Sequence, residues 1–302
     1  HLVDAACAGH AFAGLPRVLA LINYLKNRPP ADPIEIVQKS PNSLIIDGGG
    51  TNGYVTSLIG VDKGVELARQ NGFALVGIRN TWFSGRLAYY VERAARHGLV
   101  VIHTTTTTAR VAPYGGKDRV FGTNPIAFAF PCNPEPLVVD FGTGMVTWGE
   151  ALLRENLGRS LDPGSAVDVE GNPTDDPGKA LDGAFLPWGG HRGSGIALVI
   201  QVLGILCGGS VVVDDVADCG FFFLMFDPEL LMPLEEFRER MDHFADMCKS
   251  RALRPGFSEI LIPGEQEARR VARKSEVGVP LENGALDDLR ALGSELGVGA
   301  EI

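Results

Sequence analysis

The sequence predicts an α/β fold with a parallel or mixed β-sheet. Short apolar runs of strand length alternate with segments whose apolar residues recur at helical spacing, and glycines close several of the helical segments. Such an alternation with short connections is typical of α/β domains. The chain has 302 residues, of which 45% are hydrophobic and 21% charged, so it has enough apolar material for one large domain or two small ones.

The expected elements follow one another closely through the first half of the chain. We expect strands at residues 42–47, 73–78, 99–108, 125–130 and 137–140, and helices at 15–25, 61–70, 87–97 and from about 147 onward. Pro29-Pro30 ends the first helix, while Asn71-Gly72 and Gly98 close the next two. The five consecutive threonines at 104–108 need no explanation beyond β-propensity.

The second half is less regular. Residues 162–179 are polar and proline-rich, which predicts a surface excursion. Residues 194–213 are apolar over nearly the length of a membrane span, but Gln201 and the pair Gly208-Gly209 interrupt them. We therefore expect a buried helix, a glycine turn and a strand there, and no membrane association. Charged helices are expected at residues 234–249, 264–274 and 286–296.

Charge and cysteine content exclude several classes of protein. The 27 basic and 37 acidic residues give a net charge of −10, which makes nucleic acid an unsuitable partner. The five cysteines are scattered without any CxxC pair, so we expect neither a disulfide scaffold nor a metal site. This cysteine usage fits a cytoplasmic protein.

The 38 glycines gather in a few loops that suit an anionic ligand. In residues 137–149 a strand ends at Asp140, and Gly142-Thr143-Gly144 then precede a helix. Glycines at such a junction let backbone N–H groups approach a phosphate. The spacing is GxGxxxxG, and no apolar strand lies about 20 residues further on, so this is not a Rossmann fingerprint. Either nucleotide binding or a tight turn explains the segment.

Three further segments are candidates for binding. Asn124, in residues 113–125, carries an amide suited to a ligand amide or carboxylate, although a long structured turn explains the segment equally well. His191 and Arg192 lie among glycines at a helix start, which suits an anion. Residues 263–270 place Pro-Gly-Glu before a helix with Arg269-Arg270, and a solvated helix face is the simpler interpretation.

Taken together, these segments resemble the non-Rossmann malate/L-lactate dehydrogenase family, and most closely its Δ1-piperideine-2-carboxylate/Δ1-pyrroline-2-carboxylate reductases. The matching pieces include GHAFAGLPR at 9–17, VAPYGGKDRVFGTNPIAFAFP at 111–131 and LPWGGHRGSG at 186–195. The resemblance implies a mixed-sheet NAD(P)-binding domain at 43–264. It also implies a largely helical substrate and dimerisation domain, built from 1–42 and 265–302, and a homodimer with its active site near the subunit interface.

The resemblance further implies NADPH or NADH as cofactor and hydride transfer to C2 of a small cyclic 2-imino acid or 2-oxo acid. Arg17 matches the residue that holds the substrate carboxylate. The residues implied to bind the cofactor are Thr123, Asn124, Pro125, Val139, Asp140, Phe141, Gly142, Thr143, Gly144, His191, Arg192, Gly264 and Glu265.

The sequence departs from the family where a proton donor is expected. The family's catalytic histidine falls at Ala13 and a second family histidine at Phe83, and neither side chain can donate a proton. Glu150 matches a carboxylate of the imine-reducing branch and is the first candidate to replace the missing proton donor. His10, one turn away from Ala13, is the weaker candidate. An imine substrate that is already protonated at nitrogen accepts hydride readily and depends less on a proton donor of the protein. Phe12, Ala13, Trp82 and Phe83 are expected to line an aromatic substrate pocket.

Three hypotheses about function follow from these departures. The chain is a reductase of changed specificity, a family member that catalyses another reaction in a biosynthetic pathway, or a homologue that binds NAD(P) without catalysis.

Overall fold

The computed structural model describes all residues except 11–12, 215–217, 280, 282–283 and 299–302. The chain forms two compact units. The terminal unit contains residues 1–30 and 261–302, and the sheet unit contains residues 31–260. The sheet unit begins at residue 31, shortly before the first strand, which starts at residue 35. It includes all strands of the main sheet.

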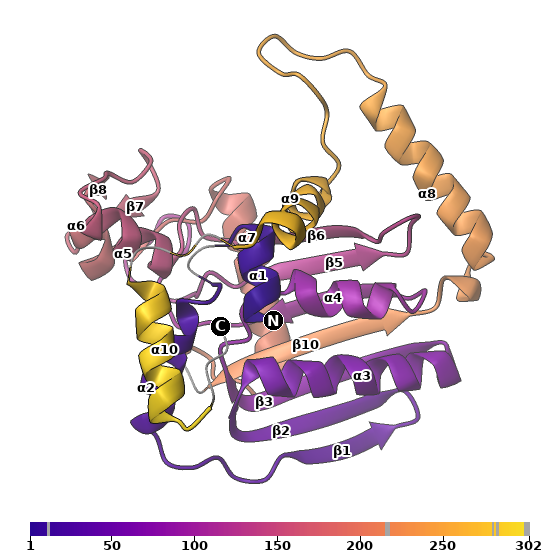
Figure 1. Ribbon diagram of the computed structural model, residues 1–302, viewed down its shortest axis with the longest axis horizontal. Helices are drawn as coiled ribbons and strands as arrows, with labels where there is room; N and C mark the ends of the chain where they lie inside the picture. Colours follow the sequence, from indigo (N-terminus) through magenta and orange to yellow (C-terminus); the bar gives the residue numbers. More distant parts are fainter. Residues whose placement is uncertain (11–12, 215–217, 280, 282–283, 299–302) are drawn as a thin grey trace. The chain divides into compact units, whose positions relative to one another are not determined.

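A mixed seven-stranded sheet organises the sheet unit (Figure 1). In spatial order its strands are β1 (Glu35–Ser40), β2 (Ser43–Asn52), β3 (Phe73–Trp82), β10 (Cys219–Phe226), β4 (Val100–Thr105), β5 (Ile126–Phe130) and β6 (Leu137–Phe141). Only the β2–β3 pair is parallel, and the other neighbours run antiparallel. The expected α/β class with a mixed sheet is confirmed, and this topology is not that of the parallel Rossmann sheet.

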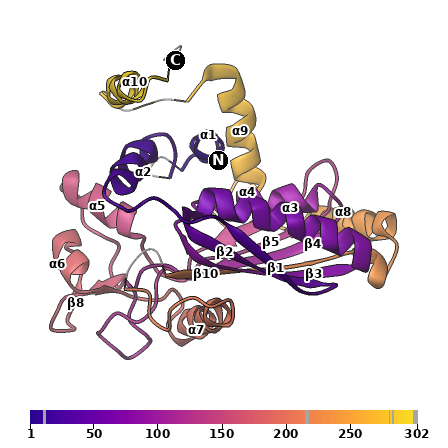
Figure 2. The same cartoon turned by 90° about the horizontal axis from the view of Figure 1, so that it is seen from below.

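Helices cover both faces of this sheet. Helices α3 (Gly53–Asn71) and α4 (Ala88–Ala95) lie on one face, and α7 (His191–Leu206) lies on the other (Figure 2). Asn52 caps α3 by accepting a hydrogen bond from Val55 N at 3.3 Å, and Gly72 ends it with φ of 84°. The core between α3, α4 and the sheet is apolar, and it also contains the fully buried imidazole of His103.

Two strands were not predicted, namely the edge strand β1 and the central strand β10. Two expectations about the second half of the chain were also wrong. Residues 211–213 do not form the expected strand, and 211–212 form a bend. Helix α7 is not buried on all sides, since Leu198 and Val202 are 52% and 53% exposed. A uniformly apolar sequence lacks the polar face that would reveal which side of a helix is covered.

A smaller subregion of the sheet unit follows β6. It contains α5 (Trp148–Asn156), α6 (Pro177–Asp182) and a three-stranded sheet in the order β8 (Pro173–Thr174), β7 (Ala166–Val167), β9 (Ala184–Phe185). The expected surface excursion at 162–179 thus holds two short strands. The η1 turn (Pro228–Leu230) and α8 (Leu234–Lys249) follow β10, and α8 buries none of its residues.

The terminal unit is helical. It consists of α1 (Leu2–Ala8), α2 (Arg17–Lys26), α9 (Glu265–Val277) and α10 (Ala285–Glu295). Lys274 Nζ in α9 donates to Ala6 O in α1 at 2.7 Å, and Lys26 in α2 pairs with Glu295 in α10 at 2.6 Å. These contacts join the two ends of the chain.

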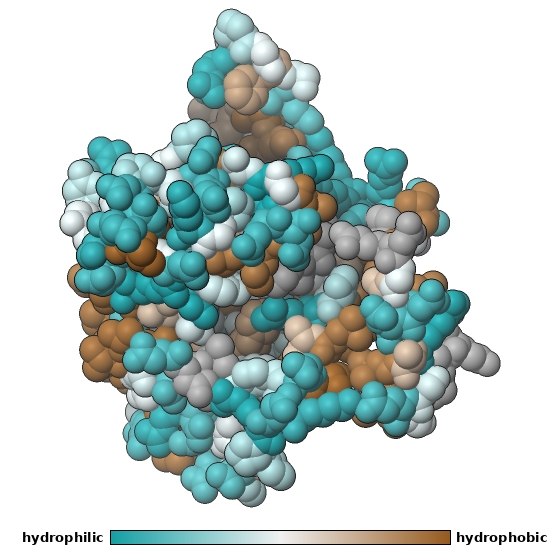
Figure 3. Space-filling model, turned by 90° about the vertical axis from the view of Figure 1, so that its left-hand side faces the viewer, coloured by the Kyte–Doolittle hydropathy of each residue, from teal (hydrophilic) through white to brown (hydrophobic). Residues whose placement is uncertain are grey.

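The surface combines hydrophilic residues with exposed apolar ones. The side of the molecule in Figure 3 is mostly hydrophilic, with apolar patches between the polar residues. Large exposed hydrophobic residues occur in both units, and they include Leu206 at 73% and Leu231 at 84% exposure. Within the described part of the chain, no helix is both long enough and apolar enough to cross a membrane.

Candidate functional site

Hydrogen bonds bring three of the predicted loops together. Thr143, after β6, is fully buried, and its backbone N and Oγ1 both donate to Thr123 O, at 2.7 and 3.0 Å. Trp188 N, just before α7, donates to Thr143 O at 3.0 Å. The loops at 123–125, 142–144 and 186–190 therefore lie side by side, although they are far apart in the sequence.

Asn124 holds this arrangement from within. Its side chain is fully buried, and Nδ2 donates to Gln201 Oε1 at 2.9 Å and to Ala197 O at 3.1 Å. Its Oδ1 accepts from Thr107 N at 3.2 Å. These bonds engage the side-chain amide inside the protein, which gives it a structural role in joining the loop to α7. Its φ of 30° is one that asparagine tolerates better than most residues.

The first turn of α7 is open to an anion. Gly189 and Gly190 have φ of 60° and 63°, and Gly190 caps α7 without any side-chain hydrogen bond. His191 and Arg192 are exposed there, and His191 meets the ring of Tyr114 edge-on at 6.0 Å. A Cβ built at Gly189 would find no atom within 4 Å, so the backbone here is accessible. Open backbone and two basic side chains at a helix N-terminus favour phosphate binding.

Strand β6, which precedes the loop at 142–144, contributes structural contacts. Asp140 Oδ2, at the end of β6, accepts from Ala88 N at 2.8 Å, and this places the carboxylate at the start of α4. The ring of Phe141 meets Trp188 edge-on at 5.8 Å. Val139 and Pro125 are half-buried beside them, and Gly142 and Gly144 flank Thr143.

Both candidate proton donors contact another side chain. Glu150, in the first turn of α5, accepts from Arg154 Nη2 at 2.8 Å, and Arg154 also pairs with Asp162 at 3.0 Å. His10, in the terminal unit, pairs through Nε2 with Glu267 at 2.9 Å. Neither side chain is presented as an unpaired acid.

The expected aromatic pocket is divided. Trp82 is 3% exposed, and its Nε1 donates to Gly50 O at 2.8 Å, so this side chain belongs to the core and is unavailable to a substrate. Phe83 is half-buried, has φ of 45° and packs edge-on against Tyr54 at 5.8 Å. Ala13 is half-buried in the terminal unit, and Phe12 lies outside the described residues.

The remaining predicted residues belong to the terminal unit. Arg17 is half-buried at the first position of α2. Gly264 caps α9 with φ of 89°. Glu265 Oε2 accepts from Ile262 N at 3.1 Å, which fixes the turn that enters α9.

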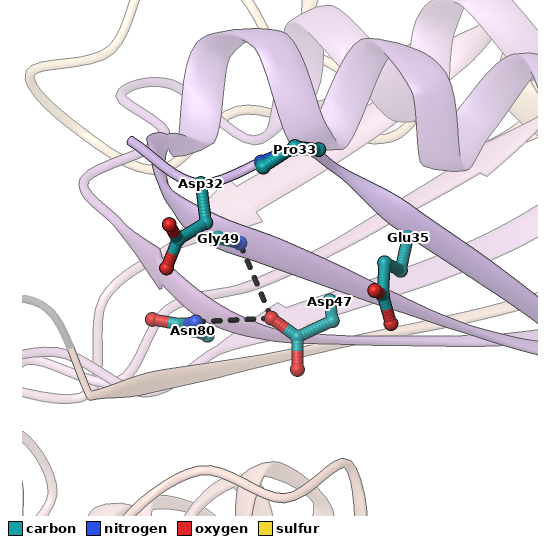
Figure 4. Close-up of a pocket in the computed structure, with 6 residues that line it drawn as sticks. All are labelled: Asp32, Pro33, Glu35, Asp47, Gly49 and Asn80. Atoms are coloured by element: carbon teal, nitrogen blue, oxygen red, sulfur yellow. Dashed lines mark hydrogen bonds between the residues drawn. The ribbon is translucent and has the colours of Figure 1, made fainter. Parts of the chain in front are cut away.

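A separate concavity of about 400 Å³ lies at the β1–β2 edge (Figure 4). Its lining includes the carboxylates of Asp32, Glu35 and Asp47. Burial raises the pKa of Asp47, but hydrogen bonds from Gly49 N, Asn80 and Arg79 outweigh it and lower the pKa below 3.8. Ionised carboxylates repel a phosphate, so this concavity is unsuited to a dinucleotide. No group of described residues is arranged to hold a metal ion.

Sequence reasoning missed two residues that shape the site. Thr107 and Gln201 complete the hydrogen bonding of Asn124, and Gln201 also donates to Val211 O at 3.0 Å. A glutamine inside a long apolar helix is a signal for a buried polar partner, because an unpaired buried amide is costly.

The mixed sheet and the joined loops at the start of α7 define an α/β protein of a non-Rossmann type. Residues 1–290 match the family model described as malate/L-lactate dehydrogenase. The chain belongs to this family of oxidoreductases.

Two similar proteins illustrate the relationship. The L-sulfolactate dehydrogenase of Methanocaldococcus jannaschii is 34% identical over 311 residues, covering 99% of this chain and 89% of the relative. A solved structure of the sulfolactate dehydrogenase from that organism has a TM-score of 0.87 at 32% identity, with the same two coverages. The structure of Δ1-piperideine-2-carboxylate reductase from Pseudomonas syringae has a TM-score of 0.83 at 25% identity, covering 96% of this chain and 89% of that one.

Proposed function

We propose that this protein is an NAD(P)H-dependent reductase that transfers hydride to C2 of a cyclic 2-imino acid or a 2-oxo acid. The observation that carries the proposal is the junction of three loops at the start of α7, where no side chain caps the helix, and Thr143 and Asn124 hold this junction. Membership of a dehydrogenase family supports the same chemistry.

The residues at this junction fit a dinucleotide. We assign the pyrophosphate to the backbone of Gly189 and Gly190 with His191 and Arg192, because open N–H groups, an imidazole, a guanidinium and the dipole of α7 converge there. We assign the rest of the contact to the residues matched by the family motifs, namely Thr123 to Pro125, Val139 to Gly144, Gly264 and Glu265. A bound reduced nicotinamide supplies the hydride.

The imino acid is the better supported substrate. Ala13 and Phe83 cannot give a proton, and Glu150 is paired with Arg154. A cyclic imine protonated at nitrogen accepts hydride at carbon and becomes an amine without a proton from the protein. Arg17 is assigned to the substrate carboxylate, since guanidinium binds carboxylate with two parallel hydrogen bonds.

The 2-oxo acid is the second candidate, and it is supported by the 34% identity to an L-sulfolactate dehydrogenase. Its reduction creates an alkoxide that needs a proton, so Glu150 or His10 would have to leave its present partner and act as acid. If Glu150 is that acid, Glu150→Gln removes 2-oxo acid reduction and leaves imine reduction in place.

A binding and turnover experiment tests the proposal. NADH and NADPH are titrated by fluorescence, and piperideine-2-carboxylate, pyrroline-2-carboxylate, pyruvate and sulfopyruvate are then offered in turn. Faster oxidation of the reduced cofactor with the cyclic imines than with the oxo acids supports the imine reductase. Dinucleotide binding without turnover of any substrate contradicts the reductase and leaves a binding homologue. Failure to bind either dinucleotide favours a different reaction.

We further propose that the protein acts as a homodimer in the cytoplasm and that the terminal unit contributes to substrate binding and dimerisation. Residues 193–206 of α7 carry no charge, and Leu198, Val199, Val202 and Leu206 are each more than half exposed. An uncharged apolar face is compatible with an identical face in a symmetric pair. Val202→Glu is expected to give a monomer by light scattering, whereas Val169→Glu, at a loop position 55% exposed, leaves the dimer intact. A wild-type protein that is itself monomeric by light scattering would contradict the proposed homodimer.

A further inference from the structure

Two arginines lie over the ring of Trp148, a tryptophan in the subregion after β6. The guanidinium carbon of Arg110 lies 3.8 Å from the ring centroid of Trp148, and that of Arg119 lies 6.0 Å from it. Trp148 is the first residue of α5, and all three side chains are half-buried. The contacts lie within the sheet unit, and none of these residues belongs to the predicted cofactor or catalytic set.

Among the described residues, no carboxylate pairs with either arginine. Arg119 donates to the neutral carbonyl oxygens of Gly183 and Leu181. In the part of the chain that the structure describes, the Arg110 guanidinium makes no hydrogen bond or ion pair, and its contact is the indole face. Arg154, in the same subregion, has two carboxylate partners.

This arrangement is unfavourable without a ligand. Burial lowers the pKa of Arg110, and repulsion from Arg119 lowers it further. Arginine binds carboxylate and phosphate through the N–H groups at the edge of its plane, and stacking on an aromatic ring leaves these groups available. The edge of Arg110, together with the N–H groups of Arg119 that do not bond to Gly183 or Leu181, forms the chemical complement of an oxyanion.

We propose that Arg110, Arg119 and Trp148 form a binding site for an oxyanion group of a small molecule. Arg119 is fixed by the carbonyls of Leu181 and Gly183 and provides a rigid charge, while Arg110 closes on the anion from the indole face. The anion is a phosphate of the dinucleotide or a second acidic group of the substrate. The site does not depend on the proposed reductase function, because inorganic anions test it directly.

The test compares inorganic phosphate and malonate with chloride at equal ionic strength. Arg110→Met keeps the apolar stem and removes the charge, and Arg159→Met is the matched control, because Arg159 is an exposed neighbour with no side-chain partner in the described residues. We expect wild type and Arg159→Met to bind phosphate and malonate by calorimetry and to unfold at higher temperature in their presence. Arg110→Met is expected to bind at least tenfold more weakly.

A second readout separates a ligand site from a structural role. In chloride alone, Arg110→Met relieves the repulsion from Arg119 and unfolds at the same or a higher temperature than wild type. A lower unfolding temperature in chloride, equal anion affinity in Arg110→Met, or no response of wild type to phosphate and malonate overturns the proposal. Weakened binding of NADPH but not NADH by Arg110→Met identifies the dinucleotide as source, and weakened binding of dicarboxylates identifies the substrate.

Discussion

The side-chain amide of Asn124 donates a hydrogen bond to Gln201 Oε1 over 2.9 Å, although the two residues are 77 positions apart. This bond links the loop before β5 to the middle of α7, and α7 begins at the proposed anion site. The position of the glycine loops relative to the start of α7 therefore depends on a buried pair of amides.

Removing the hydrogen bond between Asn124 and Gln201 is expected to lower the stability of the protein. Asn124→Ala leaves Gln201 Oε1, Ala197 O and Thr107 N without their partner in a buried place, so we expect a loss of about 3 kcal/mol in the free energy of unfolding. Urea denaturation measures it. Because the two amides act together, a cycle with Gln201→Met should give a coupling energy of about 1 kcal/mol or more. If the losses in the two single variants simply add up in the double variant, the energetic coupling between the two amides is refuted.

The hydroxyl of Thr143 is expected to matter for both stability and cofactor binding. Thr143→Val keeps the shape of the side chain but removes the bonds of Oγ1 to Thr123 O and Asn124 O, which we expect to cost about 1–2 kcal/mol. The two loops are then joined only through backbone hydrogen bonds of Thr143, and NADH titration should show weaker binding. Thr143→Ser retains the hydroxyl and serves as control. Equal stability and equal NADH affinity for the valine and serine variants would count against this role.

Two glycines of α7 should respond in opposite ways to the same change. A methyl group added at Gly193 would lie 2.0 Å from Trp188 O, whereas one at Gly195 meets nothing within 4 Å. We expect Gly193→Ala to destabilise the protein by roughly 3 kcal/mol or more through backbone displacement. Gly195→Ala should stabilise it by about 0.5–1 kcal/mol through helix propensity. Thermal unfolding compares the two, and a similar response at both positions would contradict the geometry.

Stability is expected to fall in acid partly because of His103. Burial lowers the pKa of His103 to about 3, against 6.5 for an exposed histidine. Between these pH values the unfolded chain binds the extra proton, so stability is full above pH 6.5 and falls by about 1.4 kcal/mol per pH unit as the pH drops towards 3.

The ring of His103 stacks on Phe223 with centroids 3.6 Å apart, which suits an aromatic replacement. His103→Phe should remove this part of the pH dependence in urea titrations at several pH values. His243→Gln, at an exposed position of α8, is the control and should keep the wild-type slope. An unchanged slope in His103→Phe would argue against the buried neutral imidazole.

The local pattern of the chain predicted the segments with a clear period and clear end signals. The helices around 61–70 and 234–249 and the strands at 73–78 and 137–140 all form. The pattern did not reveal that Cys219–Phe226 enters the sheet between β3 and β4, because strand order is decided by pairings between distant segments. The exposed face of α7 escaped prediction for a related reason, since an all-apolar helix gives no sign of its covered side.

The glycine loops, the pair His191-Arg192 and the replacement of expected proton donors by Ala13 and Phe83 follow directly from the amino-acid sequence, because these are properties of residue types at given positions. Which side chains are already engaged became clear from the folded chain alone. The fold turned Asn124 towards Gln201 and Trp82 into the core, where its indole bonds to Gly50. Such partners are dozens of residues away, and a buried polar group takes whichever partner the packed fold provides, which local sequence does not encode.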